Sequence, residues 1–282
     1  MPEIIRKRAR EKDPAEAKEE LEAASEMLEA EEEVAKEELA ELKKPEVELG
    51  HKEELFSTWK PKTSLGKIVL NGEIKNIDQI LDSGAKILEP EIVDILLPGL
   101  QHELLAIGQS KGKFGGGKRS IWKQTQKKTA EGNKPKFQTA IVVGNKDGYV
   151  GIGFGKSKET VPAREKALKR AKQNIIKIKR GCGSWACACK EPHSIPFVVE
   201  GKCGSVKVKL IPAPKGAGLV AESETRKILE LAGIKDVYSE ATGQASTKMN
   251  LVKAVIDALK NLNSVKVSEE HARKLGIVEG AK

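Results

Sequence analysis

The stretch FQTAIVVGNKDGYVGIGFGK, residues 137–156, decides the fold of this chain. Its apolar residues alternate and then become continuous, which predicts a strand over residues 136–143. Asn145-Lys146-Asp147-Gly148 predicts a tight turn, because an Asp-Gly pair adopts positive φ at low cost. Residues 149–154 then form the returning strand of a hairpin. Three glycines leave one face of that strand bare and allow another backbone to approach closely: Gly151, Gly153 and Gly155.

Two further elements flank this hairpin. A polar strand is predicted over residues 121–129, and a helix is predicted to begin near Thr160, the candidate cap. The helix carries a stripe of small and aliphatic residues that can lie close on a sheet: Ala163, Ala167, Ala171, Ile175 and Ile178. The order is therefore strand, strand, strand, helix.

The rest of the chain predicts a second mixed unit and three accessory segments. Two short helices, at 77–83 and 90–97, precede the first strand, and strands alternate with helices at about 222–232 and 250–262. The fold class is α+β. We divide the chain into an acidic low-complexity arm (1–52), an N-terminal extension with a Gly/Lys-rich loop (53–120), a first domain (121–180), a Cys-rich linker (181–196), a second domain (197–262) and a tail (263–282).

Charge is distributed unevenly along the 282 residues. The net charge of +9 is the sum of −9 in residues 1–54 and +18 in the remaining residues, and +16 of the latter lies in residues 111–180. A basic segment of that density favours a polyanionic partner, and the alternative is a solvated basic face. The acidic residues 15–44 predict a solvated helix or a disordered segment. Such an arm either contacts a basic partner or only keeps the chain in solution.

Several classes of protein are excluded by the same sequence. No stretch approaches the roughly 18 consecutive apolar residues of a membrane-spanning helix, and no apolar region follows the basic start, so we expect no membrane segment and no secretory signal. Gly-Lys-Ser at 155–157 ends like a phosphate-binding loop, but Val150 stands where that motif needs glycine. No nucleophile constellation is visible, and we expect no enzymatic activity.

Four side chains near the linker suggest a metal site. Cys182, Cys187, Cys189 and His193 follow the spacing C-x4-C-x-C-x3-H, and three thiolates with one imidazole form a closed tetrahedral zinc set. The alternative is that the four are reduced side chains packed in a linker. We predict a structural zinc rather than a catalytic one, because no open position is suggested. Cys203 lies outside this set.

Long stretches of the chain resemble one protein family. The hairpin stretch 137–156, Arg180–His193, Leu210–Val220 and Leu231–Val237 resemble the universal small-subunit (30S) ribosomal protein five family of archaeal/eukaryotic type, which is eukaryotic protein two in older numbering. The likeness covers roughly residues 53–262. The acidic segment 1–52 and the glycine/lysine insertion 108–120 depart from the family pattern.

This resemblance implies a double-stranded-RNA-binding-like domain followed by a left-handed β-α-β domain. It also implies a cytoplasmic, ribosome-bound protein that binds small-subunit ribosomal RNA near the decoding region, where messenger RNA enters, and supports translational accuracy and messenger unwinding. The implied neighbours are small-subunit proteins three, four and eight. It carries RNA contact to Gln126, Lys127, Lys128, Lys134, Lys136, Lys156 and Lys158. The other basic residues of the same segment extend this set: Lys111, Lys113, Lys118, Arg119, Lys123 and Arg164.

Two other functions stay open at this point. A stand-alone RNA-binding regulator with the same fold would account for the additional acidic arm and loop. A phosphotransferase is disfavoured by the incomplete phosphate-binding motif.

Overall fold

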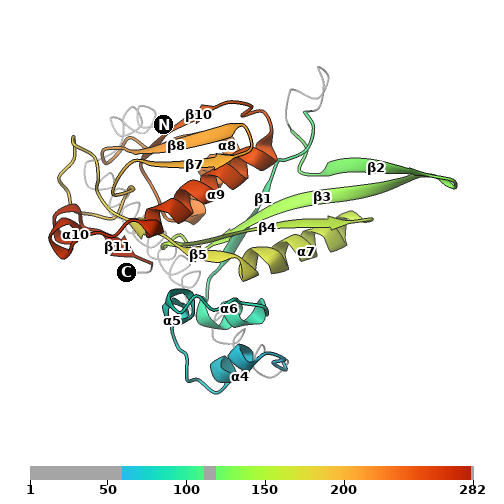
Figure 1. The fold of residues 1–282 in the computed structure, drawn as a ribbon, viewed down its shortest axis with the longest axis horizontal. Helices are drawn as coiled ribbons and strands as arrows, with labels where there is room; N and C mark the ends of the chain where they lie inside the picture. Colours follow the sequence, from blue (N-terminus) through green and yellow to red (C-terminus); the bar gives the residue numbers. More distant parts are fainter. Residues whose placement is uncertain (1–58, 111–118, 281–282) are drawn as a thin grey trace, which may run out of the picture. The chain divides into compact units, whose positions relative to one another are not determined.

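The predicted hairpin forms the centre of the first sheet in the computed structural model, which describes residues 59–110 and 119–280. Strand β3 (Gly132–Gly144) pairs antiparallel with β4 (Tyr149–Ser157) and with β2 (Lys123–Thr129). Strands β1 (Gln101–Leu105) and β5 (Ile175–Lys177) pair with β3 and β4 and complete five strands. Figure 1 shows that the β2–β3 hairpin extends beyond the end of β4.

Helix α7 (Thr160–Gln173) packs against the glycine face of β4, as the sequence predicts. Ala163, Ala167 and Ala171 of this helix are fully buried. A Cβ atom added at Gly153 would lie closer than 3.0 Å to the backbone of Ala167, so only glycine allows this approach. The order of three strands and one helix is therefore confirmed, together with the reason for the glycines.

Two details of the helix prediction are wrong. The N-cap is Glu159 rather than Thr160, and no side chain caps the helix there. The helix ends at Gln173, because the chain turns at Asn174 into strand β5. Ile175 therefore lies in that strand, and Ile178 follows it; both are buried, but neither belongs to the stripe of the helix.

The second unit combines a four-stranded sheet with two helices. The strand order in this sheet is β7 (Val199–Cys203), β8 (Val206–Pro212), β10 (Val237–Thr242) and β9 (Leu219–Val220). Its helices are α8 (Ser223–Leu231) and α9 (Lys248–Ser264). Gly201 of β7 repeats the arrangement of Gly153, because a Cβ atom there would overlap the backbone of Ala254 and Ala258 in α9. One apolar cluster joins this unit to the first sheet and includes Val142, Ile152, Leu229 and Val255.

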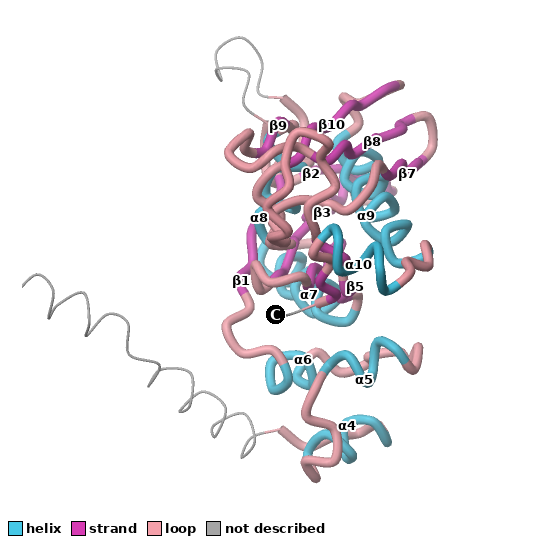
Figure 2. Tube along the Cα trace, turned by 90° about the vertical axis from the view of Figure 1, so that its left-hand side faces the viewer, coloured by secondary structure: helices cyan, strands magenta, loops and turns pink. Residues whose placement is uncertain are grey.

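Three short helices, which precede the first sheet in the sequence, lie together (Figure 2). They are α4 (Ser64–Leu70), α5 (Ile77–Asp82) and α6 (Glu91–Leu96), of which α5 and α6 agree with the predicted pair. Their apolar residues pack together with Tyr149 and Ile175 of the first sheet. The Tyr149 hydroxyl and the carboxylate of Asp78 form a hydrogen bond of 2.8 Å, which links β4 to α5.

The C-terminal segment is folded where we predicted no element. Helix α10 (Glu269–Leu275) is followed by β11 (Val278–Glu279), which pairs antiparallel with β6 (Lys179–Arg180). The buried Arg180 guanidinium donates hydrogen bonds to the Asp147 carboxylate and to the Gly280 carbonyl. The C-terminal segment therefore helps to bury the positive charge of Arg180.

Some predictions fall on residues that the structure does not describe. These are the acidic arm 1–52 and three basic residues of the loop: Lys111, Lys113 and Lys118. Among the helices that are described, none combines the length and the apolar character needed to cross a bilayer.

Candidate metal centre and nucleic-acid interface

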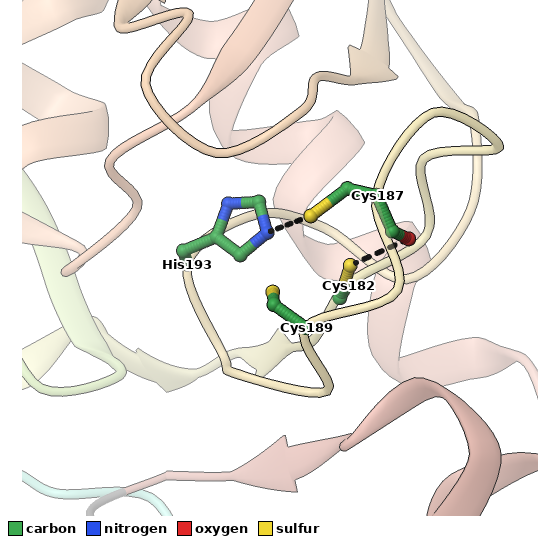
Figure 3. Close-up of side chains that lie close together, drawn as sticks. All are labelled: Cys182, Cys187, Cys189 and His193. Atoms are coloured by element: carbon green, nitrogen blue, oxygen red, sulfur yellow. Dashed lines mark hydrogen bonds between the residues drawn. The ribbon is translucent and has the colours of Figure 1, made fainter.

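The four predicted metal ligands meet around one point (Figure 3). One ligand atom from each of Cys182, Cys187, Cys189 and His193 lies within 4.8 Å of all the others. The loop that carries them is closed at its base by two backbone hydrogen bonds between Gly181 and Ser194, of 2.8 and 3.0 Å. Three sulfurs and one imidazole nitrogen at this spacing can hold a metal ion.

Asp236 orients the histidine of this cluster. His193 Nδ1 lies 2.8 Å from Asp236 Oδ2, while Nε2 lies 3.8 Å from the Cys187 sulfur. Because a carboxylate accepts hydrogen bonds, Nδ1 carries the proton and Nε2 presents its lone pair to the thiols. The other Asp236 oxygen accepts hydrogen bonds from the N–H groups of Gly216 and Gly218, at 3.1 and 2.8 Å. The buried carboxylate thus stabilises the tautomer that a metal requires.

The thiols of the cluster have strongly different environments. Hydrogen bonds from the backbone N–H groups of Lys215 and Cys189 lower the pKa of Cys187 to about 6. Burial and the neighbouring thiols raise the pKa of Cys182 to about 11. A metal ion would remove the proton from Cys182, because a coordinated thiol is deprotonated. Metal affinity should therefore fall as the pH decreases.

The predicted RNA-binding residues of the β2–β3 hairpin are divided between its two faces. Residues directly opposite in paired strands point to the same side, and alternate residues point to opposite sides. Lys127 is opposite Lys134, and Lys123, Gln138 and Lys156 form one row across three strands. One face therefore carries five lysines, which we call the lysine face: Lys123, Lys127, Lys134, Lys136 and Lys156.

The remaining predicted residues lie elsewhere. Gln126 and Lys128 are exposed on the opposite face of β2. Lys158 precedes α7 and Arg164 lies in its second turn, both exposed. Arg119 forms an isolated bridge with Ser110 and donates to the Gly108 carbonyl at 3.5 Å. These five residues are not part of the lysine face.

Comparison with known proteins identifies the family. The model for the N-terminal domain of ribosomal protein S5 matches residues 121–179, and the model for its C-terminal domain matches residues 201–274. The small ribosomal subunit protein uS5 of Nanoarchaeum equitans is 54% identical over 223 residues, which cover 79% of this chain and 96% of that protein. The chain belongs to the ribosomal protein S5 family.

Other archaeal members of the S5 family match over similar lengths. The uS5 protein of Methanocaldococcus jannaschii is 48% identical over 222 residues, covering 79% of this chain and 95% of that protein. The uS5 protein of Thermofilum pendens is 50% identical over 202 residues, covering 72% and 93%. The predicted family, and its archaeal character, are confirmed.

Sequence reasoning on this S5 protein missed Asp236. The residue is 43 positions from His193 and belongs to the turn before β10, so no local spacing reveals the pair. The only available signal is that His193 alone among the four candidate ligands needs a second partner to select its tautomer. That need indicates a carboxylate or carbonyl without saying which one.

Proposed function

We propose that the lysine face binds ribosomal RNA near the decoding region of the small subunit, where messenger RNA enters. As a member of the S5 family, the chain is a structural, non-enzymatic, ribosome-bound component of the small ribosomal subunit in the cytoplasm. The finer role that we propose is support of translational accuracy and of messenger unwinding, next to small-subunit proteins three, four and eight.

The observation that supports the RNA-binding role is the gathering of five lysines from three strands on one face of the hairpin. Lys127 and Lys134 are directly opposite each other, and like charges in this position destabilise a strand pair. Lys134 has a partial counter-charge in Glu131, but both side chains are exposed, and such surface pairs contribute little. Phosphate groups would neutralise the face and release counterions. A ribbon that extends beyond its helix can place this face in a groove of folded RNA.

Removal of two lysines of this face should weaken binding to small-subunit ribosomal RNA. The variant Lys127→Ala/Lys134→Ala should lower the slope of log affinity against log salt by about 2, one unit per lost phosphate contact. A filter-binding titration over several salt concentrations measures that slope.

The chain provides a matched control for this variant. Lys202 and Lys207 are also exposed and directly opposite each other, in the β7–β8 hairpin. Lys202→Ala/Lys207→Ala removes the same charge and should leave affinity and slope near those of the parent. Equal slopes in both variants and the parent would contradict the role of the lysine face.

A stand-alone RNA-binding regulator is the second candidate function, and the segments that favour it are the acidic arm and the loop insertion. Sedimentation of a cell extract separates the two. A ribosomal protein stays with the small subunit at moderate salt, whereas a regulator is found in free fractions.

We further propose that Cys182, Cys187, Cys189 and His193 hold a structural zinc ion. The donor set fits zinc because it is closed, and because the buried Asp236 leaves the Nε2 lone pair of His193 directed at the thiols. Bound there, zinc would supply charge neutralisation for the thiolates and a cross-link of the loop. The four residues fill all ligand positions, so no catalytic role follows.

Metal analysis tests the zinc proposal. The purified chain should contain about one zinc per molecule, and Cys187→Ser should contain close to none. Cys203→Ser is the matched control, because this thiol lies outside the cluster and packs against the main core. Zinc close to zero in both the parent and the Cys187 variant would refute the proposal.

A further inference from the structure

The loop between β8 and β9, residues 213–218, lies beside the candidate metal cluster. The Ala217 N–H donates to the Pro214 carbonyl at 3.2 Å, which closes a four-residue turn. Gly216, the third residue of this turn, has a φ of +91°, as the third residue of a type II turn requires. Lys215 is the second residue, a position at which this type of turn favours proline.

This turn contacts the cluster directly. The Lys215 N–H donates a hydrogen bond to the Cys187 sulfur, so a backbone group of the loop faces one of the four ligands. The Lys215 ammonium also lies 2.7 Å from a carboxylate oxygen of Glu191, but both side chains are more than half exposed, and such surface pairs contribute little. The direct link is therefore the backbone N–H. A metal bound to the Cys187 sulfur would fix the position of its acceptor.

Asp236 provides a second link between the loop and the cluster. One of its oxygens accepts hydrogen bonds from the N–H groups of Gly216 and Gly218, at 3.1 and 2.8 Å, and the other lies 2.8 Å from His193 Nδ1. No atom lies within 4 Å of the position that a Cβ atom would take at either glycine, so no neighbouring group packs against that side of the loop. The loop is therefore held by a carboxylate that also orients a metal ligand.

We propose that residues 213–218 form an outer layer of the metal centre, so that metal binding and the order of this loop stabilise each other. The proposal rests on the proposed zinc site. With the metal bound, Cys187 and His193 are fixed, and the acceptors of three loop N–H groups stay in place. Without it both side chains can rotate, which moves one acceptor and leaves Asp236 without its histidine partner. By linkage, a change that releases the loop weakens metal binding by the same factor.

The variant Lys215→Pro tests the direct link. Proline suits this position of the turn, so the loop can keep its shape while the N–H that faces Cys187 is lost. Zinc affinity, measured by competition with a chromophoric chelator, should fall about tenfold. Lys215→Ala is the matched control, because it removes the same ammonium group but keeps the N–H, and it should bind zinc as the parent does. Equal affinities in the two variants would overturn the proposal.

Hydrogen exchange of the unmodified full chain tests the reverse effect. Removal of zinc by a chelator should make peptides that cover residues 213–218 exchange about tenfold faster, the same factor by linkage. Strands β3 and β4 are the internal control and should keep their rates, because their own pairing holds them. An equal increase along the whole chain would overturn the proposal, because it indicates a global loss of stability.

The outcomes separate this proposal from the zinc site itself. A purified chain that binds no zinc refutes the site, and the coupling with it. A chain that binds zinc but exchanges residues 213–218 at the same rate with and without the metal refutes the coupling alone. Bound zinc, a slowly exchanging loop and weaker binding by Lys215→Pro but not by Lys215→Ala support both.

Discussion

Gly153→Ala should destabilise the protein by about 3 kcal/mol, although it adds a single methyl group. The added Cβ atom would overlap the carbonyl oxygen of Ala167 and the N–H of Ala171. These are backbone atoms of a helix, so no side chain can rotate away, and α7 would have to move off the sheet as a whole. Urea denaturation followed by circular dichroism measures the loss.

Two further variants show whether the cause is the backbone contact. Ala167→Gly added to Gly153→Ala should not restore stability, because the overlapping atom belongs to the main chain. Gly132→Ala, at the hairpin tip, has φ of +111° but no atom near its added methyl group, so it should cost only about 1 kcal/mol of strain. Similar losses at positions 132 and 153, or rescue by Ala167→Gly, would contradict the interpretation.

Asp236→Asn should leave the protein folded but weaken zinc binding about 10- to 100-fold. The amide oxygen can still accept hydrogen bonds from Gly216 and Gly218, whereas the amide nitrogen would face His193 Nδ1. An amide nitrogen donates, so the imidazole proton would move to Nε2, the nitrogen that points to the thiols. Competition with a chromophoric chelator measures the affinity.

The control for this variant is a carboxylate with a backbone partner outside the cluster. Asp257 accepts a hydrogen bond from the Lys202 N–H at 3.1 Å, and Asp257→Asn should keep the parental zinc affinity. If Asp236→Asn also keeps it, the carboxylate does not select the histidine tautomer. Asp236→Ala should instead unfold more readily, because it leaves three buried or partly buried donors unpaired.

The parts of the fold that the sequence predicts correctly are those with local signals. Alternating apolar residues and the Asp-Gly turn predict β3 and β4, and the small residues opposite their glycines predict the packing of α7. The end of α7 was missed because Asn174 lacks the glycine that usually marks a helix end. Strand β1 was missed because its residues, QHELL, do not alternate, and its partner β3 lies over 30 positions away.

The same distinction separates the two candidate sites. Three cysteines and a histidine within twelve residues are visible as a spacing, and the structure brings them together. The lysine face could also be derived from strand alternation once the register of β2 on β3 is known.

The pairing of β11 with β6 affects the order in which a newly made chain can fold. Arg180 and Gly280 are 100 positions apart, yet the Gly280 carbonyl accepts a hydrogen bond from the buried Arg180 guanidinium. While the chain is being synthesised, the first sheet can form long before residue 280 is available. Until then, the Arg180 side chain stays in partial contact with water. Full burial of this arginine therefore has to follow the synthesis of β11, which is 98 positions or more after it.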